Sequence, residues 1–371
     1  MTTEQLSLPN TSFATTPNTQ GIKYVGSKLK ILPYIIAIIS QLNNVRKVLD
    51  GFSGSTRVSQ AFVQQDYQVT ANDVAVWSEV FATCYLKSKK DDTFYQDILA
   101  HLNNLNGYDG WYTEKYGAET SGSKKPFQAK NTRKLDAVRD EIETLNLAWE
   151  DKCVVLTSLI YALDRVDSTL GHYASYLAEW SPRSYNDLIL KLPARFRHNG
   201  KHRVLRDDIF NIVKNDEYDL AYLDPPYGSN NEKMPPSRVR YAAYYHLWTT
   251  IIKHDKPDVF GKANRRTDSK DLACSSLFEE FRKDQDDKYI AMKALYRLIE
   301  QTQARYILLS YSSGGRTTKE ELNHIIKAAG TLLEFTEINY KRNVMANMRW
   351  TNDWVNESGK HCEYLFLLRK F

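Results

Sequence analysis

The residues with the clearest chemical potential form one short turn, Asp224-Pro225-Pro226-Tyr227, which follows the apolar run "YDLAYL". An ionised aspartate accepts hydrogen bonds but donates none. Pro226 fixes its own backbone and favours an extended Pro225, so we expect the Pro225 carbonyl beside the carboxylate as a second acceptor. Two adjacent acceptors match an exocyclic amino group, which donates two hydrogens. Tyr227 adds a ring face on which a base stacks for about 1–3 kcal/mol.

The turn therefore predicts a receptor for an aminated base that has left its duplex stack. The alternative is a plain turn in which the prolines only end a strand. No cation is evident near Asp224 in the sequence. We therefore expect its carboxylate to find its partner only when the base arrives.

A second polar cluster, "VLDGFSGST" at 48–56, reads as a strand end, a turn of small residues and a helix start. Gly51 and Gly54 let a ligand approach the backbone, and the helix start offers free N–H groups. Asp73 ends the next predicted strand, where an acid accepts from ribose hydroxyls. The pattern is neither the dehydrogenase glycine fingerprint nor a phosphate loop. It predicts a nucleoside-bearing cofactor, with simple capping by Asp73 and the turn as the alternative.

These clusters need a sheet to position them. Apolar runs that alternate with helical patterns predict a mostly parallel α/β sheet with its ligands at the carboxyl ends of the strands. The strand-like runs lie at 45–50, 67–74, 218–227, 304–313, 332–342 and 363–371, and a helical pattern lies at 319–330.

The predicted organisation has four parts. The catalytic unit comprises 21–85 and 204–371, and a helical insertion rich in charged and aromatic residues covers 86–203. A second insertion at 230–272, with aromatic and basic side chains, is predicted as a DNA-facing loop within the catalytic unit. Residues 1–20 have the polar composition of a flexible tail.

Composition sets the broad class. The 371 residues contain 26% charged and 42% hydrophobic residues, as in ordinary globular proteins. No apolar run is long enough to span a bilayer, the N-terminus does not look like a secretory signal, and the four cysteines have no metal or disulfide spacing. We therefore expect a cytoplasmic protein without a metal site. The net charge of +5 permits nucleic-acid binding without requiring it.

Basic residues concentrate in two places. The stretch 191–206 holds six Lys or Arg, two His and no acid, and further arginines follow in the second insertion. A solvated surface is the alternative to phosphate contact. The candidate DNA-binding residues are Arg195, Arg197, Lys201, Arg203, Arg238, Arg240, Arg265 and Arg266.

The three motifs together resemble a known family. Asp-Pro-Pro-Tyr after an apolar strand, "LDGFSGS" at 49–55 and "KYVGSK" at 23–28 are similar in order and register to the Dam-like S-adenosylmethionine-dependent N6-adenine DNA methyltransferases. The resemblance covers roughly 21–75 and 204–371, and Thr56 stands where the group has glycine. It implies a Rossmann-like, mostly parallel seven-stranded methyltransferase sheet with a mainly helical target-recognition insertion.

The resemblance also implies roles for single residues. Asp224, Pro225 and Tyr227 would hold a flipped-out adenine, with Pro226 shaping the turn. Asp73 would take the cofactor's ribose, and Asp208, rather than Asp207, its adenine amino group. The residues implied around the methionine part of S-adenosylmethionine are Tyr24, Lys28, Asp50, Phe52, Gly54 and Ser55.

The expected activity is adenine-N6 methylation of double-stranded DNA, by the modification enzyme of a restriction–modification system or by a solitary or phage methylase. A cognate restriction endonuclease is an optional partner, and we favour a monomer. Cytosine offers the same amino geometry, so N4-cytosine methylation stays open, although Ser-Pro-Pro-Tyr is more usual there. A DNA-binding module that has lost catalysis is the second alternative. The DNA sequence recognised is not predicted.

Overall fold

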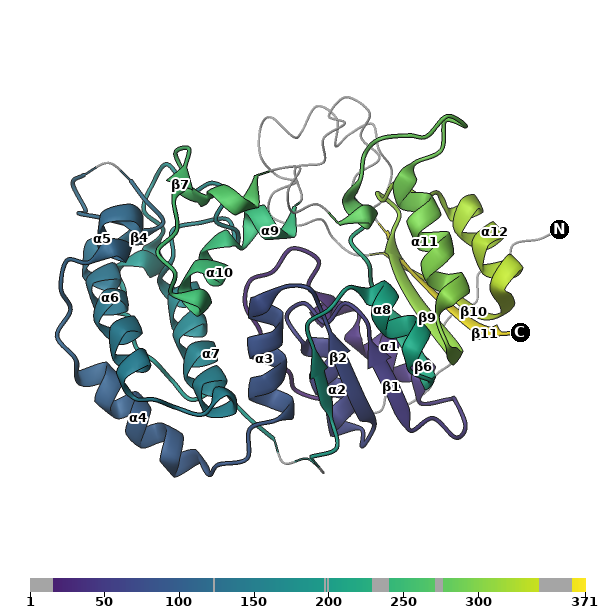
Figure 1. Cartoon of the computed structure of the whole chain (residues 1–371), viewed down its shortest axis with the longest axis horizontal. Helices are drawn as coiled ribbons and strands as arrows, with labels where there is room; N and C mark the ends of the chain where they lie inside the picture. Colours follow the sequence, from purple (N-terminus) through teal and green to yellow (C-terminus); the bar gives the residue numbers. More distant parts are fainter. Residues whose placement is uncertain are drawn as a thin grey trace.

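The computed structural model describes residues 16–122, 124–196, 198, 200–228, 240–270, 276–339 and 362–371. These residues form two lobes, a sheet lobe on the right of Figure 1 and a helical lobe on the left. Within the described ranges, no helix is both long and apolar enough to cross a membrane.

Seven strands of the described chain form the central sheet, in the order β10-β11-β9-β6-β1-β2-β5. All neighbouring pairs are parallel except those made by β11, which runs antiparallel to both β9 and β10. The expected mostly parallel methyltransferase sheet is thereby confirmed. The strands are β1 Lys47–Asp50, β2 Gln68–Asn72, β5 Arg203–Leu205, β6 Tyr218–Leu223, β9 Ala304–Ser312, β10 Gly330–Asn339 and β11 Cys362–Lys370.

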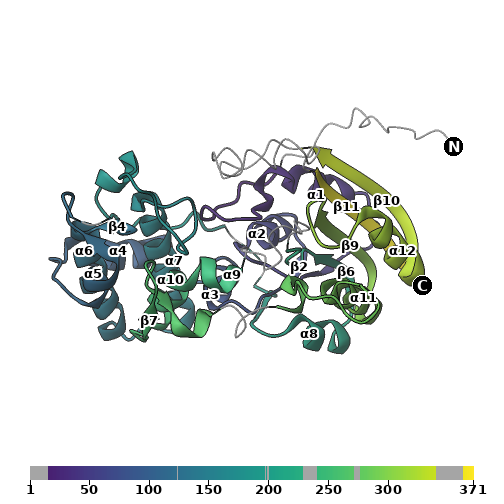
Figure 2. The same cartoon turned by 90° about the horizontal axis from the view of Figure 1, so that it is seen from above.

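Successive side chains along each strand point to opposite faces of the sheet, and this builds two apolar layers. In β6, Leu220 and Tyr222 join the core on one face, whereas Ala221 and Leu223 join the core on the other. Helices cover both faces because both are apolar. Seen from above, α1 and α2 lie on one side and α8 and α11 on the other (Figure 2). The helices of the sheet lobe are α1 Leu32–Ile39, α2 Arg57–Gln64, α3 Val76–Leu86, α8 Ile209–Asn215, α11 Ile290–Gln301 and α12 Lys319–Ala329.

The helical lobe packs against α3 through α7 and α10, so that one apolar core runs from the sheet into this lobe. Two short strand pairs complete it. Its elements are α4 Asp92–Asn104, α5 Trp111–Tyr116, β3 Gly117–Ala118, β4 Phe127–Gln128, α6 Ala129–Thr144, α7 Trp149–Val166, α9 Tyr241–Tyr244, α10 His246–Lys253, β7 Val259–Phe260 and β8 Arg265–Arg266.

The second insertion differs from the expected loop. Its described part, 240–270, forms two helices and the β7–β8 hairpin, and it packs on the other elements of the helical lobe and, through α10, on α3. The buried Arg139 of α6 donates from Nε to the Ile251 carbonyl at 2.6 Å, and Tyr116 donates to the Asn264 carbonyl at 2.8 Å. The apolar face of α10 needs cover, and the helical lobe supplies it. The short edge strand β5 is also unexpected, because it lies within a stretch that reads as a basic loop.

The start of α5 depends on one buried carboxylate from α6. Asp136 accepts hydrogen bonds from the Tyr112 and Thr113 backbone N–H groups at 2.8 and 2.9 Å and from the Thr113 hydroxyl at 2.7 Å. Helix starts leave such N–H groups without backbone partners. Asp136 therefore serves as the N-terminal cap of a helix on another segment.

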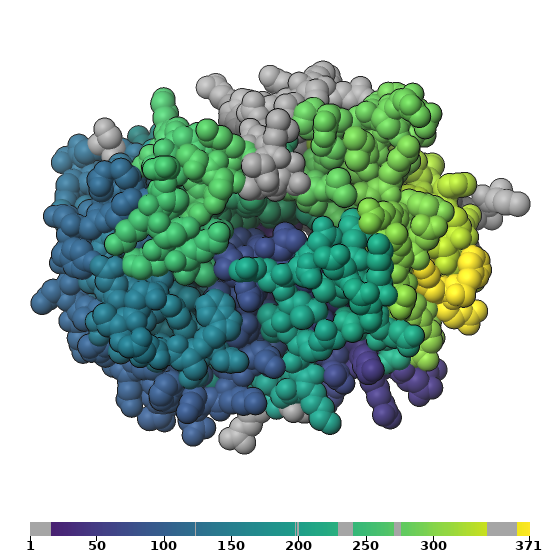
Figure 3. All heavy atoms as spheres, in the orientation of Figure 1, coloured from purple at the N-terminus to yellow at the C-terminus, as the bar shows by residue number. Residues whose placement is uncertain are grey.

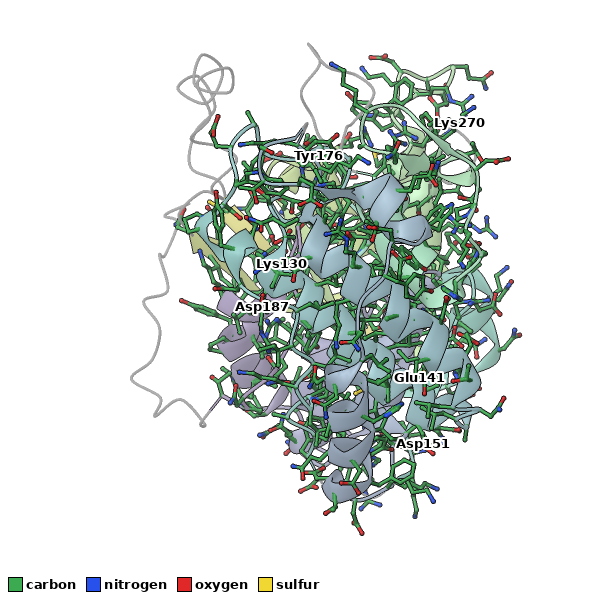
Figure 4. All side chains as sticks on the ribbon, turned by 90° about the vertical axis from the view of Figure 1, so that its left-hand side faces the viewer. Lys130, Glu141, Asp151, Tyr176, Asp187 and Lys270 are labelled. Carbon is green, nitrogen blue, oxygen red and sulfur yellow. The ribbon has the colours of Figure 1, made fainter. Side chains whose placement is uncertain are left out.

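We expect Asp136→Ala to lower the free energy of unfolding by about 2–3 kcal/mol, because buried N–H groups lose their acceptor. Urea denaturation followed by tryptophan fluorescence measures this change. Asp187→Ala is the control, since Asp187 pairs with Lys130 on the outer face of the helical lobe (Figure 4). Exposed ion pairs contribute about 0–1 kcal/mol. Equal effects of the two substitutions would contradict the capping role.

Candidate active site

Four strand ends bring the predicted polar residues to one edge of the sheet. The parallel strands β6, β1, β2 and β5 end next to one another, and Asp224, Asp50, Asp73 and Asp208 stand at or just after these ends. A cavity of about 620 Å³ lies there, and Figure 3 shows the surface hollowed between the lobes. The predicted residues that line this cavity are Tyr24, Lys28, Asp50, Phe52, Gly54, Ser55, Asp73, Asp208, Asp224, Pro225, Pro226 and Tyr227.

The turn after β1 is tied to the end of β2. The Gly54 N–H donates to Asp73 Oδ2 at 2.8 Å, and the Ser53 N–H donates to the Asn72 carbonyl at 2.9 Å. The backbone φ of Thr56 is +63°, a left-handed conformation that a β-branched residue rarely adopts. This conformation explains why glycine suits the position in the family that the sequence resembles, and here a buried threonine takes it. The turn therefore keeps its shape without the third glycine.

Asp50 is buried in the wall of the cavity. Its Oδ2 accepts a hydrogen bond from the Ser59 hydroxyl at 2.6 Å, while Oδ1 is buried without a hydrogen-bond partner. Burial raises the pKa of Asp50 to about 7, although the Ser59 hydrogen bond opposes the shift. Such an oxygen is suited to receive a cationic donor from a ligand, because an unpaired buried carboxylate is otherwise costly.

The catalytic turn contradicts one expectation. Asp224 does have a cation beside it, because Lys28 Nζ lies 2.8 Å from Asp224 Oδ1. The contact is an ion pair at hydrogen-bond distance, so the Lys28 ammonium group partly compensates the burial of this oxygen. Lys28 Nζ also lies 2.7 Å from Glu363 Oε1 and 3.3 Å from the Tyr227 hydroxyl. Lys28 was expected beside the cofactor's methionine, but its ammonium group is held on the catalytic side of the cavity.

Burial raises the pKa of Asp224 to about 7, with Lys28 lowering it and Glu363 raising it further. For Lys28, burial favours the neutral amine, but the charges of Asp224 and Glu363 outweigh it and raise its pKa well above the ordinary value. Lys28 therefore stays protonated, and burial keeps the pKa of Asp224 above that of an ordinary aspartate.

The far side of the turn rests on Arg316, a buried arginine. The backbone N–H of Arg316 donates to the Tyr227 carbonyl at 3.0 Å. Gly228 has a φ of +57°, and a Cβ atom there would lie 2.0 Å from Arg316 Nη1. Glycine suits position 228 because another residue would be strained in this conformation and would displace the Arg316 side chain. The Tyr227 ring packs edge-on against Tyr311 at 5.3 Å between ring centroids.

The Asp208 end of the cavity is apolar, and of its walls only Phe52 was predicted from the sequence. Asp208 caps α8 by accepting from the Phe210 N–H at 2.8 Å. Phe210 stacks on Phe278, and Phe52 meets Phe278 edge-on. Val74 and Leu277 line the same end and are largely exposed. The signal for these residues was weak, because 276–279 is one turn of 3-10 helix in a polar stretch.

Several predicted DNA contacts are not at this edge. Arg203 begins β5 and so lies at the amino edge of the parallel strands, where it pairs with Asp216. Arg195 is nearby, paired with Asp92 and stacked over Tyr95. Lys201, just before Arg203, belongs to the same edge. These residues therefore lie at the edge of the parallel strands opposite the cavity, and their contact with DNA phosphates stays a prediction.

The candidate DNA-binding arginines of the second insertion lie in different surroundings. Arg266 is buried and paired with both Asp255 and Asp268, so its guanidinium serves the fold and the predicted phosphate contact is not supported. Arg265 stacks over Phe260 on the hairpin, and Arg240 directly precedes α9, whose Tyr241 lines the cavity. Arg197 and Arg238 lie outside the described residues. No cluster of His, Cys, Asp and Glu suited to a metal ion is found among the described side chains.

Comparison with protein families matches residues 24–322 to the D12 class of N6 adenine-specific DNA methyltransferases. The chain belongs to this family. The match runs from the Tyr24 segment, through the glycine turn and the catalytic turn, and into α12. D12 class enzymes use S-adenosylmethionine as methyl donor, so the predicted cofactor is confirmed at the level of the family.

Three similar proteins are methylases or methyltransferases by name. The chain is 28% identical over 369 residues to modification methylase StsI of Streptococcus sanguinis, and 26% identical to type II methyltransferases M.FokI of Planomicrobium okeanokoites and M.NlaIII of Neisseria lactamica. Each match covers 94% of this chain. The chain spans about half the length of the StsI and FokI enzymes, and nearly all of NlaIII (52%, 53% and 99%).

The cavity fits the methyl donor of the D12 class. The unpartnered Asp50 oxygen suits the ammonium group of a methionine part, and the exposed apolar side chains Val74 and Leu277 suit an adenine ring. Asp73 lines the same cavity; its two oxygens accept from the Gly54 and Ala75 N–H groups and have further lone pairs for ribose hydroxyls. The acids that line the cavity also favour a cofactor that carries a positive charge.

We expect Asp50→Asn to weaken S-adenosylmethionine binding about 10–100-fold, since a hydrogen bond to a charged group contributes about 1.5–3 kcal/mol. In the unsubstituted protein the affinity is expected to fall as the pH drops through about 7, because protonation of Asp50 removes the charge that attracts the cofactor. Isothermal titration calorimetry between pH 5.5 and 8.5 measures both effects. An affinity for Asp50→Asn equal to that of the unsubstituted protein would exclude this assignment.

Proposed function

We propose that this protein methylates the N6 amino group of a specific adenine in double-stranded DNA, with S-adenosylmethionine as methyl donor. The observation that carries the proposal is the position of Asp224-Pro225-Pro226-Tyr227 at the end of β6, in one cavity with the residues suited to the cofactor. Membership of the adenine-specific family supports adenine over cytosine.

The protein's part in the reaction is to position and polarise the target amino group. An N6 lone pair is delocalised into the ring and is a poor nucleophile. Asp224 and the Pro225 carbonyl, by accepting hydrogen bonds from its two N–H groups, would favour a pyramidal nitrogen with the lone pair directed at the donor methyl. The bound cofactor supplies an electrophilic sulfonium methyl. Orientation and fixed charges then account for most of the rate increase.

Base stacking would complete the site. The Tyr227 ring lies beside Asp224, and its edge contact with Tyr311 and the Arg316 hydrogen bond to its carbonyl fix its place. Burial raises the pKa of Tyr227 well above its ordinary value, so the ring stays neutral. The target base must be extruded from the duplex to reach this cavity.

The DNA is proposed to lie across the mouth of the cavity between the lobes. The described 240–270 segment flanks this mouth, with Arg265 as a remaining candidate for phosphate contact, whereas Arg240 is buried. Restriction–modification is the proposed context, because the relative StsI is named a modification methylase and the relatives M.FokI and M.NlaIII are named type II methyltransferases. Action as a monomer is part of the same proposal, since one chain contains every group that the transfer uses.

We expect Asp224→Ala to lower methyl transfer to duplex DNA at least about 1,000-fold, because the amino group loses its charged acceptor. Cofactor binding is expected to stay within about threefold, as Asp224 is not assigned to the methionine part. The assay combines labelled S-adenosylmethionine with mass spectrometry of the DNA nucleosides and sequencing that detects modified bases.

The outcomes separate the alternatives. N6-methyladenine at one sequence supports the proposal, and N4-methylcytosine replaces it with cytosine methylation. DNA binding and cofactor binding without any transfer would indicate a binding module that has lost catalysis. Undiminished transfer by Asp224→Ala would refute the assigned mechanism.

A further inference from the structure

Glu363 lies among the catalytic residues although it is eight positions before the last residue of the chain, Phe371. It is the second residue of β11, and its register partner on β9 is Ser312. Because β11 runs antiparallel to its neighbours, its first residues lie at the edge where the parallel strands end. A residue near the end of the sequence thus reaches the carboxyl edge of the sheet.

Its side chain is buried and is held from two sides. Glu363 Oε1 accepts from Lys28 Nζ at 2.7 Å and from the Ser310 hydroxyl at 2.6 Å. Ser310, on β9, is fully buried. A carboxylate fixed in this way holds the lysine ammonium in one place, because charge-assisted hydrogen bonds are short and strong.

The lysine connects Glu363 to the catalytic turn. Lys28 Nζ lies between Glu363 Oε1 and Asp224 Oδ1, at 2.7 and 2.8 Å. The contact engages the buried oxygen of Asp224 and leaves Oδ2 for an amino group. One cation is shared by two carboxylates, so Asp224 is oriented by Lys28 without being fully neutralised.

We propose that Glu363 is a positioning residue for methyl transfer, which acts through Lys28 to orient Asp224 and to keep its acceptor strength high. The inference rests on the proposed function, since Asp224 is taken as the acceptor for the target amino group. Ser310 belongs to the same chain of contacts and fixes Glu363 in turn. Without the charge of Glu363, Lys28 would pair with Asp224 alone and weaken it as an acceptor.

The charged groups around Asp224 give this proposal a definite sign. The cation next to Asp224 is Lys28, and the two acids that interact with Asp224 are Glu363 and Asp50. Burial raises the pKa values of the neighbouring tyrosines, so they stay neutral and do not titrate near pH 7; they are Tyr24, Tyr222, Tyr227 and Tyr241. Because the Glu363 charge raises the pKa of Asp224, its removal lowers that pKa.

The test is Glu363→Gln, which keeps the size of the side chain and removes its charge. We expect the transfer rate at saturating substrates to fall about tenfold, and the acidic limb of its pH profile to move down by about one pH unit. The KM for S-adenosylmethionine is expected to stay within about twofold. Glu363→Asp keeps the charge and is expected to keep the limb near its original pH, even where the rate falls.

The control is Glu337→Gln on β10, which removes an acid that pairs with Lys319 on the same sheet. This substitution is expected to change neither the rate of methyl transfer nor the position of the acidic limb of its pH profile. The position of the limb does not depend on how much of a variant is folded, so partial unfolding does not hide the result. An unmoved limb in Glu363→Gln, with or without a lower rate, would reduce Glu363 to a structural residue and overturn the proposal.

A second readout separates this inference from the proposed function. Carbon-13 NMR of aspartate-labelled protein reports the titration of Asp224 directly, with Asp224→Asn to assign its signal. The signal is expected to titrate at lower pH in Glu363→Gln than in the unsubstituted protein. If the titration of Asp224 shifts but no methyl group is transferred to DNA, the proposed function fails and the coupling of Glu363 to Asp224 stands. If methyl transfer occurs and the titration is the same in both proteins, the coupling fails.

Discussion

The site depends on one buried ammonium group shared between two carboxylates. Lys28, Asp224 and Glu363 come from an N-terminal 3-10 turn, the end of β6 and the start of β11. Burying a charge in a protein interior without an opposite charge beside it is strongly unfavourable. The three side chains must therefore arrive together, and this requirement links the two ends of the chain to the catalytic turn.

The sheet order makes that meeting possible. Parallel β6 and β9 place Asp224 next to Ser310, and the reversed β11 places Glu363 beside both. A parallel last strand would carry its first residue to the opposite edge. The antiparallel direction of β11 therefore has a chemical consequence as well as a packing one. The acids of the cavity, Asp50, Asp73 and Asp224, lie on neighbouring strands, so the sheet also concentrates negative charge where a cationic donor is proposed to bind.

Much of this arrangement follows from the sequence. Asp50, Asp73 and Asp224 each end an apolar run, and parallel strands bring such ends to one edge. Glu363 was missed, although an acid at the start of the apolar run "EYLFLLRK" was a signal, because the direction of a strand is not written in its own residues. The position of Arg195 and Arg203 at the amino edge of the sheet was not predicted for a related reason. A run of charge shows that a surface is polar, but not which edge of the sheet it follows.

The most direct test of the central claim is the pH dependence of methyl transfer in Lys28→Met. Without the ammonium group, two buried carboxylates face each other and the pKa of Asp224 is expected to rise from about 7. The acidic limb of the rate profile should then move to higher pH, with activity lost near neutrality and partly recovered in alkaline buffer. A limb at the same pH as in the unsubstituted protein would show that Lys28 does not control the charge of Asp224, and it would contradict the account of the site given above.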